Sequence, residues 1–313
     1  MEFDLIDLIR RRAAGARTDV ALGIGDDGAL LVPPPGHELA VAIDTLVEGV
    51  HFPVASAPAD IGWKALAVNL SDLAAMGATP AWALLSLTMP EPDADFVQAF
   101  ADGFAQLASQ HDVALVGGDT TGGPLSVSVC VHGFVPRGQA LRRDGARVGD
   151  GVYVTGTLGD AAAALRDLDA PERASSVLRQ RLDRPVPRVA VGQALRESAH
   201  ACIDVSDGLL ADLAHVCRAS GAGADIDADR LPLSEALLAQ VDVDAARRFA
   251  LTGGDDYELC FTASSDAAVS RALAHAGCTA TRIGEITADG PVRVLEHGHD
   301  ITPERHGWEH FDA

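Results

Sequence analysis

The chain has 313 residues, of which 48% are hydrophobic and 22% are charged, and its formal net charge is −21. At about 150 residues per domain, this length predicts two domains or one large α/β unit. No apolar run approaches the ~18 residues that a membrane span needs, and the negative charge repels nucleic-acid phosphates and anionic lipid headgroups. We therefore expect no nucleic acid and no membrane among the partners.

Lysine and cysteine usage excludes several mechanisms. Lys64 is the only lysine, so the chain lacks a Gly-Lys-Ser/Thr phosphate loop, and a Schiff-base or protein-kinase type of lysine could only be Lys64. The five cysteines form no CxxC pair, and the start of the chain lacks the apolar core of a signal peptide. These features indicate a reducing, cytoplasmic location.

The first predicted elements are a strand over 38–47 and a helix from Pro58 to just before Gly77. Apolar residues alternate along the strand and leave Asp44 near its end, on the face opposite the larger apolar side chains. In the helix, apolar residues recur at helical spacing. Asp72 falls on the face away from this apolar stripe. Both carboxylates are therefore candidate site residues.

A second helix follows over 96–107, and two further strands complete a first domain that we place at 1–137. The segment 113–123 predicts a short buried strand that runs into a glycine-rich turn with Asp119 at its tip. The segment 125–135 alternates valine with polar residues, which is typical of a strand with two different faces.

The second domain, 138–313, begins with an aperiodic connection and again mixes strands with glycine turns and helices. GTLGDAAAAL at 156–165 is either a phosphate cradle at a helix N-terminus or a tight strand-to-helix turn. In ACIDVSDGLL at 201–210, Ser206 stands at the expected N-cap of a helix. TGGDDYELCF at 252–261 repeats a Gly-Gly-Asp sequence before another strand.

Aspartates gather at predicted strand ends, glycine turns and one helix face. They are Asp26, Asp27, Asp44, Asp72, Asp119, Asp204, Asp207 and Asp255. Clustered carboxylates repel one another unless cations lie among them. Oxygen ligands without nearby cysteine or paired histidine favour Mg²⁺, which usually completes its coordination with water and phosphate oxygens. The sequence therefore predicts a nucleotide as the ligand, although a single Asp beside Gly more often forms a turn.

Several other residues have a structural alternative. Arg143 either contacts a phosphate or is an ordinary surface arginine. Trp308 is more often a core or docking residue than a ligand platform. His51 shows no local sign of more than packing. The histidines at 297–310 lack the spacing of a metal site.

Eight segments together resemble the thiamine-monophosphate kinase family. In order they are GIGDDGALL, IDTLVEGVHF, WKALAVNLSDLAAMGATP, VGGDTTGGPLSVSVCVHGFVP, RRDGARVGDGVYVTGTLGD, IDVSDGLLADLAH, TGGDDYELCF and HGWEHF. The resemblance covers nearly the whole chain, from about residue 3 to residue 311. The family resembles aminoimidazole ribonucleotide synthetase, selenophosphate synthetase and a hydrogenase maturation factor, which use ATP without a P-loop.

The resemblance implies transfer of the ATP γ-phosphoryl group to thiamine monophosphate, giving thiamine diphosphate and ADP. The implied Mg²⁺ ligands are Asp27, Asp44, Asp72, Asp119, Asp204 and Asp207, with Asp72 bridging several ions. The implied ATP contacts are Gly118, Asp119, Arg143 and Ser206. The implied substrate contacts are His51, Asp255 and Trp308. No catalytic base is implied, because catalysis would be electrostatic and positional.

The resemblance also implies a two-domain fold like that of aminoimidazole ribonucleotide synthetase. Its N-terminal α/β domain would form a barrel with the sheet of a partner in a homodimer, and its C-terminal α+β domain would close over ATP. The sequence departs from the family at Ala42 and Ile43, where hydroxyl residues are usual, at Asp255, which replaces a Glu, and at Ala101, where some relatives have an aromatic residue. Two alternatives stay open: a relative that phosphorylates another anionic acceptor, and a non-catalytic acidic nucleotide or metal binder.

Overall fold

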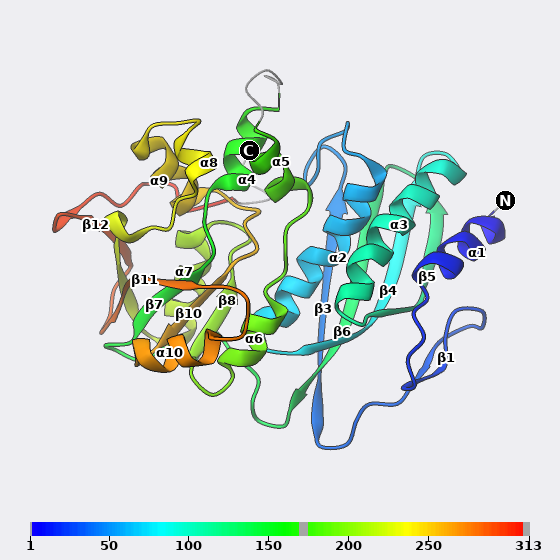
Figure 1. The fold of residues 1–313 in the computed structure, drawn as a ribbon, viewed down its shortest axis with the longest axis horizontal. Coiled ribbons are helices and arrows are strands. Elements are labelled where there is room, and N and C mark those ends of the chain that lie inside the picture. The colour runs from blue at the N-terminus through cyan, green and yellow to red at the C-terminus, as the bar shows by residue number, and fades with distance from the viewer. Residues whose placement is uncertain (1, 169–174, 309–313) are drawn as a thin grey trace. The chain divides into compact units, whose positions relative to one another are not determined.

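The structure is a computed structural model and describes residues 2–168 and 175–308 (Figure 1). Its contacts divide the chain into two compact units. The first comprises Met1–Leu73 and Ala78–Gly138, and the second comprises Ala74–Gly77 and Gln139–Ala313. Among the helices of the described residues, none combines the length and the apolar character needed to cross a membrane.

The first unit alternates helices and strands. Its elements are α1 (Glu2–Ala13), β1 (Val20–Leu22), β2 (Leu30–Leu31), β3 (His37–Val47), α2 (Pro58–Ala75), β4 (Thr79–Met89), α3 (Ala94–Gln110), β5 (Ala114–Gly122) and β6 (Ser126–Pro136). β1 and β2 form a small hairpin, and the other four strands form a mixed sheet in the order β3-β6-β4-β5. β3 and β5 are therefore the two edges of this sheet.

The two faces of the four-stranded sheet differ in burial. Val127, Val129 and Val131 of β6 are fully buried on one face, where α2 and α3 lie along the sheet (Figure 1). Alternate residues of β3 point to the opposite face of the sheet, where Val41 and Ile43 are 52% and 64% exposed. The period-2 patterns predicted for β3 and β6 are thus confirmed, and one apolar sheet face is open in this unit.

The second unit contains most of the remaining elements. They are β7 (Gly151–Thr155), α4 (Asp160–Arg166), α5 (Ser176–Asp183), α6 (Val189–Leu195), β8 (Ala201–Asp204), α7 (Leu209–Ser220), β9 (Gly223–Asp227), η1 (Ala228–Arg230), α8 (Glu235–Leu238), α9 (Val243–Thr252), β10 (Leu259–Ala263), α10 (Asp266–Leu273), β11 (Ala280–Thr287), β12 (Val292–Glu296) and β13 (His299–Asp300). The strands form one sheet in the order β13-β12-β9-β11-β7-β10-β8.

This sheet is covered on both faces. One face packs against α7 in a core that includes Val154, Ile203 and Leu213. On the other face Tyr153 and Phe261 stack with their ring centroids 5.2 Å apart, and the Tyr153 hydroxyl donates to Asp266 at the start of α10. A mixed α/β first unit and an α+β second unit were predicted, and this fold class is confirmed.

Candidate active site

Asp44 on β3 is tied to α2 by one buried amide. The backbone N–H of Asp44 donates to Oδ1 of Asn69 at 3.0 Å, and Nδ2 of Asn69 donates to the carbonyl oxygen of Ala65 at 2.9 Å. Asp72 follows Asn69 by three residues, so both lie on one face of the helix. The half-buried carboxylate of Asp72 is thereby placed on the helix face that contacts β3. α2 is buried on nearly all sides, unlike the one-sided apolar stripe expected from the sequence.

Asp119 lies within an edge strand and not at the tip of a turn, so that part of the prediction is wrong. β5 continues through Gly118 and Asp119 to Gly122, parallel to β4, and Asp119 pairs with Ser86. Gly118 has φ +153°, and a Cβ there would overlap the carbonyl oxygen of Leu85. The glycine therefore allows close strand pairing where the sequence suggested a break.

Asp44 and Asp119 are well separated along the sheet. The register aligns Asp44 with Val129, Leu85 and Gly118 in one row across β3, β6, β4 and β5. Three strand spacings of about 4.8 Å separate the ends of this row, about 14 Å in all. Asp27 is exposed in the loop between β1 and β2, where its N–H donates to Oδ1 of Asp26. Among the described residues, no three of the predicted Mg²⁺ ligands bring their oxygens within 4.8 Å of one another.

In the second unit, Asp204 ends β8 and is buried, and the next residues turn around the carboxylate of Asp212. Oδ2 of Asp212 accepts the backbone N–H groups of Ser206, Asp207 and Gly208 at 3.0, 3.1 and 3.2 Å. Burial, together with the charges of Asp204 and Asp207, raises the pKa of Asp212 to about 7. No pattern in the sequence distinguishes Asp212 from other acidic residues of a helix.

The N-cap of α7 is Gly208 and not the predicted Ser206. Gly208 has φ +124°, a conformation that favours glycine, and it makes no side-chain cap bond. Asp212 in the first helical turn supplies the acceptor instead. The prediction failed because a carboxylate from the first turn of the helix reaches back to these N–H groups, as in a capping box.

Asp255 and Trp308 both contact the turn that carries Ser206 and Asp207. The N–H of Asp255 donates to the carbonyl oxygen of Ser206, and that of Trp308 donates to the carbonyl oxygen of Asp207, each at 2.9 Å. Oδ1 of Asp255 accepts the Tyr257 hydroxyl at 3.0 Å. The side chain of Trp308 is 50% exposed, which excludes a core position for this residue.

His51 and Lys64 interact in the first unit. Nδ1 of His51 accepts the N–H of Val47 at 3.0 Å, so the neutral ring carries its proton on Nε2. Nζ of Lys64 donates to the carbonyl oxygen of His51 at 3.0 Å, and Lys64 is buried. The only lysine of the chain therefore holds the segment that carries His51.

The backbone around Arg143 is fixed against β8 and the end of α7. The carbonyl oxygen of Arg142 accepts the N–H of Cys202 at 2.9 Å, and that of Arg143 accepts the Ser220 hydroxyl at 3.0 Å. Arg142 pairs with Asp144. Arg143 is exposed and forms no ion pair with the other described residues. The backbone of Arg143 is thus fixed, and its side chain is exposed at the surface.

The glycine turn before α4 is a tight turn and not a phosphate cradle. Both carboxylate oxygens of Asp256 lie within 3.0 Å of the N–H of Gly159. A carboxylate of this chain thus occupies the place that a phosphate would take, and α4 has only seven residues. Burial raises the pKa of Asp256 well above its usual range.

Glu258 forms a buried ion network beside this turn. Its carboxylate accepts two hydrogen bonds from Arg188, one from Arg181 at 2.7 Å and one from the Thr155 hydroxyl at 2.6 Å. Arg181 also donates to the carbonyl oxygen of Thr157. Glu258 thus ties β7, α5 and the start of β10 together. No motif or spacing in the sequence separates Glu258 from the other acidic residues.

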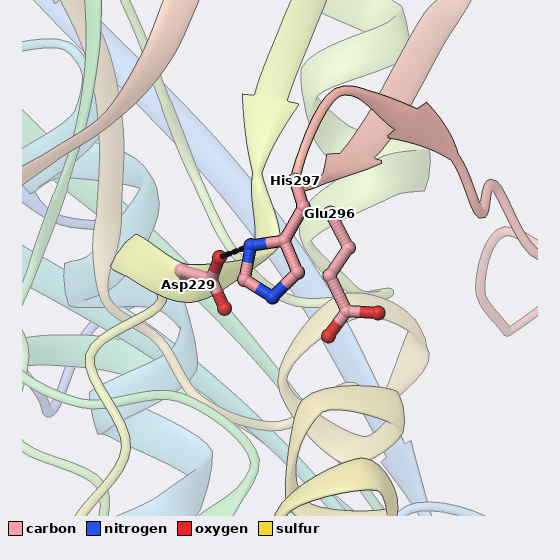
Figure 2. Close-up of side chains that lie close together, drawn as sticks. All are labelled: Asp229, Glu296 and His297. Carbon is pink, nitrogen blue, oxygen red and sulfur yellow. Dashed lines mark ion pairs between the residues drawn. The ribbon is translucent and has the colours of Figure 1, made fainter.

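Asp229, Glu296 and His297 cluster at the end of β12, but they are already paired (Figure 2). Nδ1 of His297 lies 3.2 Å from Asp229. Arg247 forms ion pairs with both Asp229 and Glu296. Because Arg247 already pairs with both carboxylates, a metal ion would have to compete with its guanidinium at this cluster.

Comparison with known proteins identifies the family. The N-terminal domain model of AIR synthase related proteins matches residues 25–135, and the C-terminal domain model of the same proteins matches 147–296. Thiamine-monophosphate kinase from Salmonella typhimurium is 48% identical over 99% of this chain and 98% of its own.

Two solved structures are also similar over nearly the whole chain. Thiamine-monophosphate kinase from Stenotrophomonas maltophilia K279a is 54% identical, with a TM-score of 0.87 over 95% of this chain and 97% of its own. The structure of AaThiL complexed with AMPPCP and TMP is 35% identical, with a TM-score of 0.79 over 99% of this chain and 97% of its own. The chain therefore belongs to the thiamine-monophosphate kinase family of AIR synthase related proteins.

Proposed function

We propose that this chain transfers the γ-phosphoryl group of ATP to thiamine monophosphate with the help of several Mg²⁺ ions, giving thiamine diphosphate and ADP. One observation in the structure carries most weight. The turn that bears Ser206 and Asp207 also accepts the backbone N–H groups of Asp255 and Trp308. Residues expected to contact nucleotide, metal and substrate thus lie around one short turn.

The donor chemistry of the acidic residues fits Mg²⁺. The residues that would hold the ions are Asp27, Asp44, Asp72, Asp119, Asp204 and Asp207, all oxygen donors. Mg²⁺ prefers carboxylate oxygens and keeps positions for water and phosphate. When bound, the ions would offset the repulsion between the anionic donor and acceptor phosphates and help to align them.

The polar groups of the chain would bind and orient the two substrates. Arg143, exposed and without an ion-pair partner among the described residues, is suited to a phosphate of ATP. Gly118, Asp119 and Ser206 would complete the nucleotide contacts. The acceptor phosphate has a second pKa near 6 and is already ionised at pH 7, so no strong base is required.

The thiamine monophosphate side would be formed by His51, Asp255 and Trp308. The half-exposed indole of Trp308 offers a face for the cationic thiazolium ring or for the pyrimidine ring. The side chain of Asp255 is oriented by the Tyr257 hydroxyl. His51 has Nδ1 engaged by the backbone, which leaves the Nε2 proton as its donor group.

We further propose that the protein acts as a cytoplasmic homodimer with functional domains at 1–137 and 138–313. The open face of the first unit supports the dimer. Ile43, Cys130 and Leu84 stand in one row on that face, and an apolar sheet face of this kind is usually covered. All five cysteines, each within the described residues, are free thiols, which supports a reducing compartment.

The positions of Asp44 and Asp119 also support the dimer. They occupy opposite edge strands, too far apart within one protomer to share an ion. If two sheets close around a twofold axis along a barrel, the β3 edge of one meets the β5 edge of the other. Asp44 of one protomer would then lie beside the partner's Asp119, and each metal site would draw on both protomers.

Product analysis tests the proposed reaction. Purified protein with ATP, Mg²⁺ and thiamine monophosphate should form thiamine diphosphate, and other phosphate monoesters offered as acceptors should give far less product. Efficient phosphorylation of another acceptor would assign the chain to a related activity. ATP binding without turnover on any acceptor would make it a nucleotide binder and would overturn the proposal.

A further inference from the structure

The turn from Val205 to Gly208, which we call the β8–α7 turn, has every backbone polar group hydrogen-bonded. The N–H of Val205 donates to Glu258 and its carbonyl accepts from Tyr257, both at 2.8 Å. The other three N–H groups converge on Asp212, and the remaining carbonyls accept from Asp255, Trp308 and Asp212. A turn satisfied at every position has little freedom to shift.

The three converging N–H groups form a concavity of the kind that binds anions. In this chain a carboxyl group of the protein fills the concavity, because Oδ2 of Asp212 lies 3.0 to 3.2 Å from all three nitrogens. Asp212 is only 3% exposed. These N–H groups are therefore not available to a substrate phosphate, and the turn presents to its surroundings the side chains of Ser206 and Asp207.

The carbonyl side of the same turn holds two segments distant in sequence. Asp255, with φ +67°, is attached through its N–H to Ser206, and Trp308 is attached through its N–H to Asp207. A Cβ at Gly254 or Gly307 would overlap these carbonyl oxygens. A shift of the turn would therefore move the backbones of both segments.

We propose that Asp212 is a positioning residue that couples the metal and nucleotide contacts to the substrate contacts through the β8–α7 turn. This inference rests on the proposed function for its kinetic consequences. Removing the carboxylate deprives three backbone N–H groups of their acceptor at once, and these groups then compete for other partners. The positions of Ser206, Asp207, Asp255 and Trp308 should therefore change together, and no one of them should change alone.

The test compares Asp212→Ala and Asp212→Asn with the wild type. Loss of a residue that orients metal-binding groups typically costs about 10- to 100-fold in affinity or activity. Asp212→Ala should raise the KM for ATP and the KM for thiamine monophosphate together and lower kcat. Asp212→Asn keeps an acceptor oxygen but loses the charge that strengthens its bonds, so its values should lie between those of wild type and Ala.

A spectroscopic readout separates this role from the proposed activity. Trp63 and Trp82 are buried, so Trp308 is the tryptophan open to acrylamide quenching. Asp212→Ala should change the quenching of Trp308, because its anchor on Asp207 shifts. This result is expected even if the protein turns over a different acceptor, so failure of the proposed reaction and failure of the inference are distinguishable.

Asp167→Ala provides the matched control. Asp167 is a buried carboxylate of the same unit, bonded to Arg166 at 2.6 Å and remote in sequence from the β8–α7 turn. The Asp167→Ala protein should be less stable than the wild type but should keep both wild-type KM values. If Asp212→Ala leaves the KM values and the quenching unchanged, or behaves as Asp167→Ala does, the inference is overturned. If Asp212→Ala does not fold, wild-type KM values for both substrates in Asp212→Asn would overturn it.

Discussion

Asp44 and Asp119 stand at opposite edges of one four-stranded sheet, in adjacent rows of its register. Two strands lie between them, so the two carboxylates of one protomer are too far apart to share one ion. In the proposed dimer, the partner would complete the site as well as cover an apolar face.

Hybrid dimers test whether the site is shared. Asp44→Asn and Asp119→Asn homodimers should both be nearly inactive. A purified hybrid with one copy of each should regain about half of the wild-type activity, because one of its two sites then contains no substitution. A hybrid of Asp44→Asn with Asp72→Asn is the control and should stay inactive, since Asn69 binds the backbone of Asp44 and lies on the same helix face as Asp72. An inactive first hybrid would contradict the shared site.

Asp72→Asn should reduce activity at least tenfold, about 1.4 kcal/mol in the activation free energy. The substitution removes one charge from the proposed ion cluster with almost no change in shape. Steady-state rates across a range of Mg²⁺ concentrations measure the effect. Asp102→Asn, which only loses a surface ion pair with Arg12, should behave as wild type. If the Asp72→Asn protein folds and keeps more than a tenth of wild-type activity, a bridging role for Asp72 is excluded.

Trp308→Ala should raise the KM for thiamine monophosphate about twofold to thirtyfold, if stacking on the ligand contributes ~0.5 to 2 kcal/mol. The KM for ATP should change little, because the proposed nucleotide contacts involve other side chains. The melting temperature should also change little, since the indole is half exposed and the backbone bond to Asp207 remains. An unchanged KM for thiamine monophosphate would exclude Trp308 from the site.

Glu258→Gln should lower the free energy of unfolding by about 3 to 5 kcal/mol near neutral pH, because it breaks a buried ion network. Burial acts to raise the pKa of Glu258, but hydrogen bonds and charges from Arg188 and Arg181 outweigh burial and hold that pKa below 4.5. The network therefore stabilises the fold fully above pH 4.5, and this stabilisation is lost as the pH falls through the folded-state pKa.

Denaturant unfolding at several pH values measures this difference. The gap between wild type and Glu258→Gln should be constant from pH 6 to 7 and should narrow below about pH 4.5. Glu296→Gln, which weakens the more exposed pair with Arg247, is the control and should cost far less. A gap that stays constant down to pH 3 would show that folding does not lower the pKa of Glu258, and would contradict this role of the ion network.

Local pattern predicted much of the fold. The alternation in β3 and β6 followed directly from residue spacing, because a strand with one buried face has a period of two. The glycines of β5 were misread as a turn, because their role depends on pairing with β4, which lies about thirty residues earlier in the chain. Strand pairing of this kind is a tertiary property that a local pattern does not contain.

The candidate site residues that belong to long motifs were predicted from the sequence. The residues that hold them in place through hydrogen bonds were not predicted. Asp204, Ser206 and Asp207 were identified together from the sequence. Asp212 holds the turn that carries them, but nothing in the sequence distinguishes it from other acidic residues in helices. Asn69 likewise has no distinguishing neighbour, although its amide fixes the backbone of Asp44. Such residues are identified by their hydrogen-bond partners, which appear only in the folded chain.

Carboxylate-bound Mg²⁺ is proposed to support the transfer from ATP to thiamine monophosphate. This role is tested by following ADP and thiamine diphosphate together while Mg²⁺ is varied and then removed with a chelator. One thiamine diphosphate should form for each ADP at saturating Mg²⁺, and neither product should form after chelation. Formation of thiamine diphosphate that persists without a divalent cation, or release of ADP with no thiamine diphosphate, would contradict it.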